Sequence, residues 1–441
     1  MPLSANEQYL LELINRGRLD PVAEAARYGI DLNANLAAGT ISSTAKQVLA
    51  PNTLLEAAAT GHSLWMLSTN IFTHKGENGS SLGTRATAAG YQWNRIGENI
   101  AVWGTSGTLN MTSAIDSHHR GLIQSAGHRT NLMQNSYSEI GLAQESGKFA
   151  FSGGTPNNAS MLTELFGSKA GSKLLTGVAY SDSDGNSFYT VGEGRAGTTF
   201  EVAGQAVQSE SAGGYAISLG QMNAGVVMGV ANDMFYSAVL DFSGGNAKLD
   251  IVNGNTYFTS APIVLCSGIN NVTQLGVANL SVIGNASGNF IIGNAGNNEL
   301  IGYGGNDVIY AYAGNDGLRG GDGHDHFLGG NGDDILVGEA GLDYMHGEAG
   351  RDWMIGGTGA DWFAFADTNG TDTIEDFSLI ERDRLRLNDD LWTGTLTTDE
   401  IVSRFATVTA AGVVFNFGDG DTLTLLGVTT TTGLADAVLI W

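Results

Sequence analysis

Residues 329–355 divide into three blocks of nine, GGNGDDILV, GEAGLDYMH and GEAGRDWMI, with no residue left over. Each block opens with Gly and has Gly again at position four, Asp at position six and an apolar residue at position eight. The same register extends to nine consecutive blocks between residues 284 and 364. A random glycine-rich linker has no reason to keep an apolar residue in phase nine times. The pattern therefore predicts a repeating backbone structure that buries one side chain per block.

Position six of the blocks carries a row of carboxylate or amide side chains: Asn289, Asn298, Asp307, Asp316, Asp325, Asp334, Asp343, Asp352 and Asp361. Position eight carries the apolar residues, which we expect to stack inward as a thin core: Ile291, Leu300, Ile309, Leu318, Phe327, Leu336, Met345, Met354 and Phe363. The glycines allow sharp turns, so backbone carbonyls come to face the carboxylates. Ligands that are all oxygen suit a hard cation such as Ca²⁺.

The charge of the chain supports cation binding and excludes some partners. The formal net charge is −25, which argues against nucleic acid or an anionic membrane as a partner. Residues 284–376 contain 16 Asp and Glu against 2 Lys and Arg. Stacked carboxylates repel one another unless ions lie between them. We therefore expect this region to fold poorly without metal.

The repeat resembles the RTX (haemolysin-type) calcium repeat, whose fold is a parallel β-roll. The resemblance implies two repeats per turn, with several Ca²⁺ ions, each between loops two repeats apart. The carboxylate pairs would be Asp307 with Asp325, Asp316 with Asp334, Asp325 with Asp343, Asp334 with Asp352, and Asp343 with Asp361. Sites that use Asn289 or Asn298 should be weaker or empty. The fourth repeat departs from the pattern because it opens with Ala311 and Tyr312.

The chain termini bear on the compartment. The N-terminus has no basic region followed by an apolar run, so it does not resemble a signal peptide. Ser4 and Glu7 form a capping box, which predicts a helix with an apolar face of Leu10, Leu13 and Ile14. No stretch reaches the roughly 18 apolar residues of a membrane span, and Cys266, the single cysteine, cannot form an intramolecular disulfide. These features alone favour the cytosol.

The RTX resemblance implies the opposite location. Such proteins are exported from Gram-negative bacteria by a type I secretion exporter that recognises an uncleaved C-terminal signal. We therefore expect a secreted, extracellular protein, with the cap of the roll and the secretion signal in residues 365–441. Low cytosolic Ca²⁺ would leave the repeats unfolded for export, and Ca²⁺ outside would fold them.

The N-terminal region contains three distinctive stretches: FTHKGENG (72–79), IGENIAVW (96–103) and HHRGLIQSAGHRTNLM (118–133). In order and spacing they resemble the CAP domain (the cysteine-rich secretory, antigen 5 and pathogenesis-related, or SCP-like, family) in a form without disulfides. The resemblance implies an α-β-α sandwich over residues 1–168, with antiparallel strands between helical layers.

Members of that family carry two His and two Glu around a cleft. Here His74, Glu98 and His128 match three of the four. Two imidazoles and a carboxylate can hold Zn²⁺ or act as acid and base. The expected position of the second Glu has His118 and His119 nearby and no Glu, so whether the cleft is catalytic is left open. His62 is expected to be a structural residue in an apolar helix.

Residues 173–260 alternate polar and apolar residues between glycine-rich turns, which predicts a small β-sandwich that serves as a spacer. Within it, Asp182, Asp184, Asn186 and Glu193 resemble the ligands of a calcium loop. Their spacing departs from that of an EF-hand, because Gly185 comes one position early, and an Asx-rich turn without metal is the alternative. The chain as a whole is thus expected to be multidomain, with the β-roll at residues 284–364.

Three functions are compatible with this organisation. The first is a secreted calcium-binding protein whose CAP cleft binds a lipid, peptide or envelope ligand. The second is a secreted, calcium-dependent peptidase that uses His74, Glu98 and His128. The third is an adhesive or structural surface protein. The missing second Glu, and the lack of any GxSxG or HExxH motif, favour the first.

Overall fold

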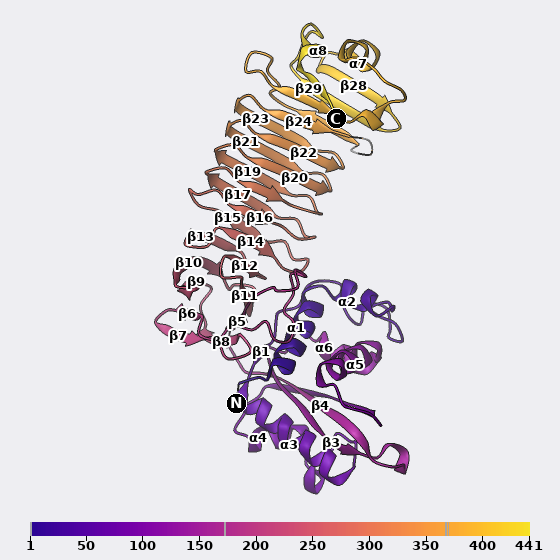
Figure 1. The fold of residues 1–441 in the computed structure, drawn as a ribbon, viewed down its shortest axis with the longest axis vertical. Helices are drawn as coiled ribbons and strands as arrows, with labels where there is room; N and C mark the ends of the chain where they lie inside the picture. Colours follow the sequence, from indigo (N-terminus) through magenta and orange to yellow (C-terminus); the bar gives the residue numbers. More distant parts are fainter. Residues whose placement is uncertain (1, 172, 367, 369) are drawn as a thin grey trace. The chain divides into compact units, whose positions relative to one another are not determined.

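The computed structural model describes residues 2–171, 173–366, 368 and 370–441 (Figure 1). The chain forms two compact units. The first comprises residues 1–236 and 240–261, and the second comprises residues 237–239 and 262–441.

The first 168 residues of the first unit contain six α-helices, two 3₁₀ turns and four strands. The helical elements are α1 (Ala5–Leu19), α2 (Pro21–Arg27), α3 (Thr53–Thr69), η1 (Glu77–Gly79), α4 (Leu82–Ala88), α5 (Met111–Gln124), α6 (Ala126–Leu132) and η2 (Phe151–Gly153). The strands are β1 (Ala50–Pro51), β2 (Arg95–Thr105), β3 (Glu139–Phe149) and β4 (Asn157–Ser168).

These elements form three layers, as the sequence predicted. The sheet has the order β1-β3-β4-β2; β4 is antiparallel to both β2 and β3, and β1 is parallel to β3. On one face, Leu55 of α3 packs in the same cluster as Leu165 of β4. On the other face, Ile14 of α1 and Ile115 of α5 pack with Phe166 of β4. Strand β2 is at the edge, which leaves one side of it open to loops and helix ends.

Helix α1 begins where its capping box predicted. The Ser4 hydroxyl accepts a hydrogen bond from the Glu7 amide, and the Glu7 carboxylate accepts one from the Ser4 amide at 2.9 Å. These bonds satisfy two of the amides that a helix start leaves without partners. The predicted apolar residues Leu10, Leu13 and Ile14 are buried.

The rest of the first unit contains strands β5 to β12, except that residues 237–239 of β10 belong to the second unit. They are β5 (Lys173–Tyr180), β6 (Thr199–Val202), β7 (Gln205–Gln208), β8 (Gly214–Gly220), β9 (Ala224–Ala231), β10 (Met234–Asp241), β11 (Ala247–Val252) and β12 (Thr256–Thr259). Their orders are β7-β6-β9-β10 and β12-β11-β5-β8. This is the small β-structure predicted for residues 173–260; that it folds as a separate domain stays a prediction.

The second unit is built mainly of strands, in two sheets. One sheet contains β13 (Ile263–Ser267), β15 (Ser281–Ile283), β17 (Glu299–Gly304), β19 (Gly317–Asp322), β21 (Ile335–Gly341), β23 (Trp353–Gly359) and β25 (Thr371–Ile374). The other contains β14 (Asn271–Gln274), β16 (Phe290–Ile292), β18 (Val308–Tyr310), β20 (His326–Asn331), β22 (Tyr344–Ala349), β24 (Trp362–Phe365) and β26 (Arg384–Leu387).

Consecutive repeats alternate between these two sheets, so two repeats make one turn of a parallel β-roll (Figure 1). Leu300 pairs with Leu318, and Ile309 pairs with Phe327, each 18 residues further on. All nine position-eight side chains are at most 1% exposed. The predicted thin apolar core is therefore confirmed.

From the third repeat onward, position two adopts the left-handed region even where it is not Gly, whereas Asn285 and Asn294 of the first two repeats do not. Tyr303, Tyr312, Glu339 and Glu348 have φ of 89°, 80°, 76° and 70°. The departure at Ala311 and Tyr312 therefore does not interrupt the roll, because the surrounding ladder holds Tyr312 in a conformation that L-residues disfavour.

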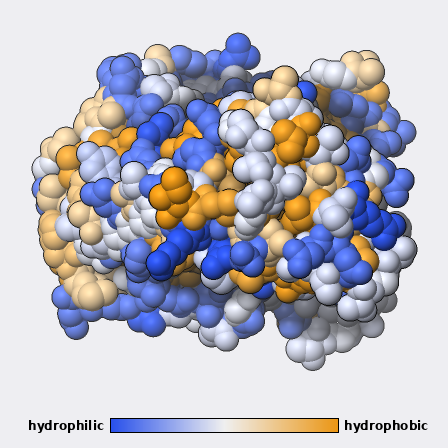
Figure 2. Space-filling view, turned by 90° about the horizontal axis from the view of Figure 1, so that it is seen from above, coloured by the Kyte–Doolittle hydropathy of each residue, from blue (hydrophilic) through white to orange (hydrophobic). Residues whose placement is uncertain are grey.

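The C-terminal elements continue both sheets. They are η3 (Asp389–Leu391), α7 (Thr398–Phe405), β27 (Ala406–Val408), β28 (Gly412–Gly418), β29 (Asp421–Leu426), α8 (Leu434–Ala437) and β30 (Val438–Ile440). Strand β29 pairs with β25, and β30 pairs with β26. Figure 2 shows one face of the molecule, on which hydrophobic and hydrophilic residues are mixed.

Candidate functional sites

The position-six side chains form two rows, one along each edge of the roll. In each row, one carboxylate oxygen (Oδ1) accepts the backbone N–H of the position-six residue one turn earlier. Asp325 Oδ1 accepts from Asp307, Asp334 from Asp316, and Asp343 from Asp325, at 2.7–2.8 Å. This contact fixes each carboxylate between two neighbouring turns.

The second oxygen of these carboxylates is buried and has no hydrogen-bond partner among the described residues. This holds for Oδ2 of Asp307, Asp316, Asp325, Asp334, Asp343 and Asp352. Each residue is at most 3% exposed. A buried carboxylate oxygen without a partner costs free energy, so six in phase indicate that these positions bind cations.

The glycines at position one leave room beside these oxygens. A Cβ added at Gly302, Gly320 or Gly347 would lie 2.0–2.1 Å from Oδ2 of the Asp five residues on. Carboxylate and carbonyl oxygens around a space closed to side chains are the donor set that Ca²⁺ takes. The residues present therefore fit calcium.

Burial strongly affects the protonation of these acids. Burial raises the pKa of Asp307 and of Asp316 to about 7, and repulsion from Asp325 and Asp334, respectively, adds to it. It raises the pKa of Asp334 to about 6 and that of Asp343 to about 7. Without a bound cation, the folded roll therefore favours the protonated form of these carboxyl groups. The second oxygen of each group has no hydrogen-bond partner among the described residues.

The first two repeats differ because their position-six side chains are amides. Asn289 Oδ1 accepts the N–H of Asn285, and Asn298 Oδ1 accepts the N–H of Asn294, both at 2.9 Å. The protein thus satisfies these oxygens itself. That sites using them are weaker or empty stays a prediction, which this arrangement favours.

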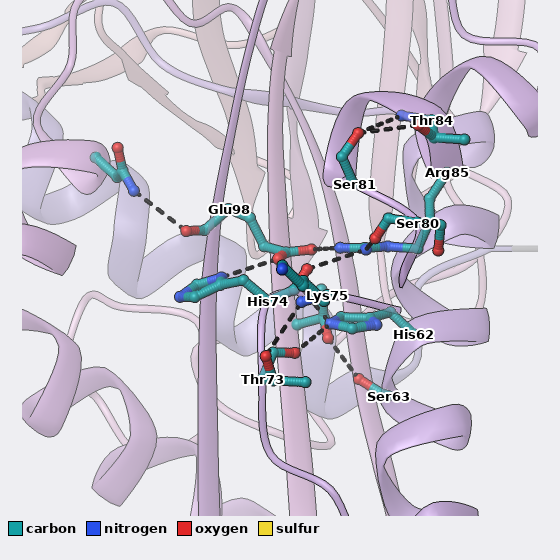
Figure 3. Close-up of polar contacts among 12 residues, drawn as sticks. His62, Ser63, Thr73, His74, Lys75, Ser80, Ser81, Thr84, Arg85 and Glu98 are labelled. Carbon is teal, nitrogen blue, oxygen red and sulfur yellow. Dashed lines mark hydrogen bonds and ion pairs between the residues drawn. The ribbon is translucent and has the colours of Figure 1, made fainter. Parts of the chain in front are cut away.

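His74 and Arg85 lie around the carboxylate of Glu98, which is on edge strand β2 (Figure 3). The Glu98 carboxylate is 1% exposed. One of its oxygens is 2.9 Å from Nδ1 of His74, and the other is bound by the guanidinium of Arg85 from α4. His74 is 52% exposed, so its ring lies between the buried carboxylate and solvent.

Two further histidines lie near this cluster. His62 of α3 is buried; its Nε2 is 3.0 Å from the Thr73 carbonyl and 4.0 Å from Glu98. Burial lowers the pKa of His62, and burial together with the charge of His74 lowers that of His128. His128 lies on α6, where its carbonyl accepts a hydrogen bond from Asn99, the residue after Glu98.

The zinc site expected at His74 and His128 finds no support in this geometry. Both Glu98 oxygens are already engaged, one of them by a guanidinium, which competes with any metal. Within the described ranges, the one place where three His, Cys, Asp or Glu ligand atoms lie within 4.8 Å of one another is the loop of Asp182, Asp184 and Glu193.

That loop brings together three of the four residues predicted for it. Glu193 is buried, and its oxygens accept hydrogen bonds from the Ser183 and Thr190 amides at 2.7 and 2.9 Å. Burial alone would raise the pKa of Glu193, but these hydrogen bonds lower it. Asn186 instead donates to Asp184 and Asp182. The loop is an Asx-rich turn that is satisfied without an ion, and calcium there stays a prediction.

His118 and His119 do not join the cleft. His118 contacts Ser160 at 2.9 Å, and His119 contacts Glu24 at 2.9 Å; both are buried. Asp116, which precedes them on α5, accepts a hydrogen bond from the Tyr9 hydroxyl at 3.0 Å.

Sequence reasoning missed Arg85 and His62 as members of the Glu98 cluster. Neither lies in a stretch with a fixed spacing from Glu98, so only the fold brings them together. It also missed Asp372, which follows Asp352 in the same row. A two-residue insertion hides Asp372 from a search for a strict period of nine.

Two family models match the chain, one in the N-terminal region and one in the repeats. The family model of the cysteine-rich secretory protein family (CAP) matches residues 11–149. The model of the RTX calcium-binding nonapeptide repeat matches residues 283–318, 292–327 and 328–363. The chain carries a CAP domain and RTX calcium-binding repeats. The two together indicate a secreted calcium-binding protein, and no described helix is long and apolar enough to cross a membrane.

Three solved structures are similar to parts of the chain. An extracellular SCP-domain protein from Bacillus anthracis is 23% identical over 28% of this chain and 35% of its own, with a TM-score of 0.21. An outer surface protein of Borrelia burgdorferi is 17% identical over 27% of this chain and 77% of its own, with a TM-score of 0.20. The extracellular lipase LipA of Serratia marcescens is 18% identical over 38% of this chain and 45% of its own, with a TM-score of 0.20.

The chain thus spans about a third of the length of the first of these structures. TM-scores this low carry no argument about function. None of the curated proteins compared with the chain matches it.

Proposed function

We propose that this protein leaves the cell unfolded by type I secretion, folds its RTX roll on extracellular Ca²⁺, and presents the CAP cleft as a binding surface. The observation that carries the proposal is the set of six buried carboxylate oxygens without partners. Bound Ca²⁺ would coordinate these oxygens and neutralise the negative charge of the carboxylates. In the cytosol, where Ca²⁺ is scarce, their repulsion and desolvation oppose folding.

The pairing of β30 supports export before folding. This strand lies in the segment expected to carry the secretion signal; it pairs with β26, and its Val438 is 4% exposed. A signal in this segment is engaged in the folded roll. An exporter that recognises it would therefore meet a free signal only while the roll is unfolded.

The Glu98 cluster supports binding over catalysis. Arg85 holds one oxygen of Glu98 and His74 is beside the other, so the carboxylate already has two partners. A shallow hollow on α4, the helix that carries Arg85, is lined by Leu82, Trp93 and Ile96 together with small residues of that helix. We propose a lipid, peptide or envelope ligand with an apolar part, held beside the exposed His74.

One observation favours the alternative of a peptidase. His74 is exposed while its Nδ1 lies against buried Glu98, which is how a carboxylate orients a histidine for proton transfer. Incubating the full-length protein with a diverse peptide library and Ca²⁺, and analysing the products by mass spectrometry, tests this alternative. We expect the wild-type protein to cleave the peptides no more than the His74→Ala and His128→Ala variants do. Cleavage lost in both variants would establish the peptidase instead.

Limited proteolysis tests the calcium part of the proposal. The full-length protein is digested in Ca²⁺ and in EGTA, and the cut sites are mapped by mass spectrometry. We expect residues 284–376 to be protected in Ca²⁺ and cut throughout in EGTA, because the unpaired carboxylates then destabilise the roll. Equal protection in both conditions contradicts calcium-dependent folding.

A further inference from the structure

One of the two carboxylate rows continues beyond the nonapeptides. Asp372 on β25 accepts the backbone N–H of Asp352 through Oδ1 at 3.0 Å, which is the contact that links each Asp in the repeats to the preceding turn. The separation is 20 residues here instead of 18. Strand β25 continues the same sheet, since Trp353 pairs with Thr373 and Met354 with Ile374.

The sequence around Asp372 keeps the essentials of the repeat. Gly370 occupies position four with φ of 92°, Asp372 occupies position six, and Ile374 occupies position eight. Thr368, at position two, has φ of 67°, in the same left-handed region as Tyr312. Ile374 is fully buried, like the apolar residues of the nine repeats. This half-turn is therefore a displaced tenth repeat.

The Asp372 carboxylate has an unsatisfied oxygen. The residue is 0% exposed, and its Oδ2 has no hydrogen-bond partner among the described residues. The nearby Asp421 does not neutralise it; Asp421 is itself a carboxylate, and it accepts the amides of Thr368 and Gly370. The preceding member of the row, Asp352, has a buried, unpartnered Oδ2 of its own.

The other row ends differently. Asp383 accepts the Asp361 amide through Oδ1 at 3.0 Å, but its Oδ2 accepts the Ser378 amide at 2.7 Å. Both oxygens of Asp383 are thus satisfied by the protein. The two rows thus end on carboxylates at equivalent positions. Backbone N–H groups satisfy both oxygens of Asp383, whereas Oδ2 of Asp372 has no hydrogen-bond partner among the described residues.

We propose that Asp352 and Asp372 hold one more divalent cation, Ca²⁺, beyond those of the nine nonapeptides, at the junction of the roll with its C-terminal elements. The proposal rests on calcium binding by the repeats as proposed above. In this arrangement, Asp352 contributes to two ions, one shared with Asp334 and one shared with Asp372. Asp372 is then the last ligand of the row.

Counting bound ions in the full-length protein tests this. Ca²⁺ per folded chain is measured by equilibrium dialysis and atomic spectroscopy for wild type, Asp372→Asn and Asp383→Asn. We expect Asp372→Asn to bind one ion fewer than wild type. Asp383→Asn is the matched control, and we expect it to bind as many ions as wild type. An unchanged count in folded Asp372→Asn overturns the proposal.

A second variant decides the question if Asp372→Asn does not fold. Asp352→Asn should lose two ions if Asp352 is shared with Asp372, but only one if Asp352 ends the row; a loss of one overturns the proposal. Wild type that binds no Ca²⁺ contradicts the proposed function itself. Wild type that binds calcium while both variants give the overturning counts contradicts only the extra site.

Discussion

At the scale of single residues, the backbone of position two carries conformational strain. Tyr312 has φ of 80° and is 58% exposed, so its side chain contributes little packing to offset the left-handed backbone. An L-residue with a Cβ costs about 1–2 kcal/mol in this region, and Gly does not bear this cost. The strain is tolerated because the ladder on both sides fixes the turn.

Tyr312→Gly should therefore stabilise the calcium-bound roll by about 1 kcal/mol. Chemical denaturation in Ca²⁺, followed by circular dichroism, measures the change. Tyr310→Gly is the matched control, because Tyr310 lies in strand β18 and its ring packs against Phe290. We expect the control to destabilise the roll. A loss of stability in Tyr312→Gly contradicts the strain argument.

At the scale of secondary-structure elements, a buried ion cluster joins α1 to β11. Lys248 Nζ lies 2.7 Å from Glu12 and also contacts Asp250, and all three residues are at most 4% exposed. Removing the amine leaves two buried carboxylates without their cation.

Lys248→Met should lower the free energy of unfolding of the first unit by about 3–5 kcal/mol, the usual cost of breaking a buried ion pair from one side. Denaturation followed by tryptophan fluorescence measures it. The control is Lys148→Met, an exposed lysine bonded to Asn158, which should change stability by no more than about 0.5 kcal/mol. Equal small effects of both variants contradict a structural role for the cluster.

The elements that the sequence predicted are those whose signals are local. The capping box at Ser4 marked the start of α1, and the period of nine marked the strands of the roll. The Glu98 cluster was only partly predictable, because Arg85 and Glu98 come from different elements whose approach depends on the order of the sheet. Asp372 was missed for a related reason: its role follows from the pairing of β23 with β25, which tolerates an insertion that a strict period does not.

The pKa values of the roll predict how its metal-free form responds to pH. An unfolded Asp titrates near about 3.9. In the folded roll, burial raises the pKa of Asp307 and Asp343 to about 7 and that of Asp334 to about 6. Between these pH values the unfolded chain ionises while the folded roll keeps its protons. The metal-free roll is therefore most stable below about pH 4, loses stability as pH rises to about 7, and has lost this contribution above it.

Circular dichroism in EGTA between pH 4 and pH 8 checks this expectation. The β signal should fall as pH rises, and Ca²⁺ should restore it at pH 8, where the carboxylates are ionised and free to bind the cation. The same series in Ca²⁺ is the control and should stay flat from pH 7 to 8. A metal-free signal that grows with pH contradicts the assignment of buried, proton-binding carboxylates.

At the scale of the whole molecule, the folding of the two units should depend on calcium to different extents. The first unit is held by apolar clusters on both faces of its sheet and by the Lys248 ion cluster. The second unit has a core only one apolar side chain deep per repeat, beside rows of unsatisfied carboxylates. Calcium should therefore govern the folding of the second unit and leave the helices of the first largely unaffected.

The most direct test is a calcium titration of the full-length protein from EGTA, followed by far-ultraviolet circular dichroism at pH 7.5. The predicted result is a cooperative gain of β signal, while the helical contribution of the first unit does not change. Variants Asp325→Asn and Asp334→Asn should shift the midpoint to higher Ca²⁺. A spectrum that is the same in EGTA and in Ca²⁺ would contradict calcium-dependent folding of the roll.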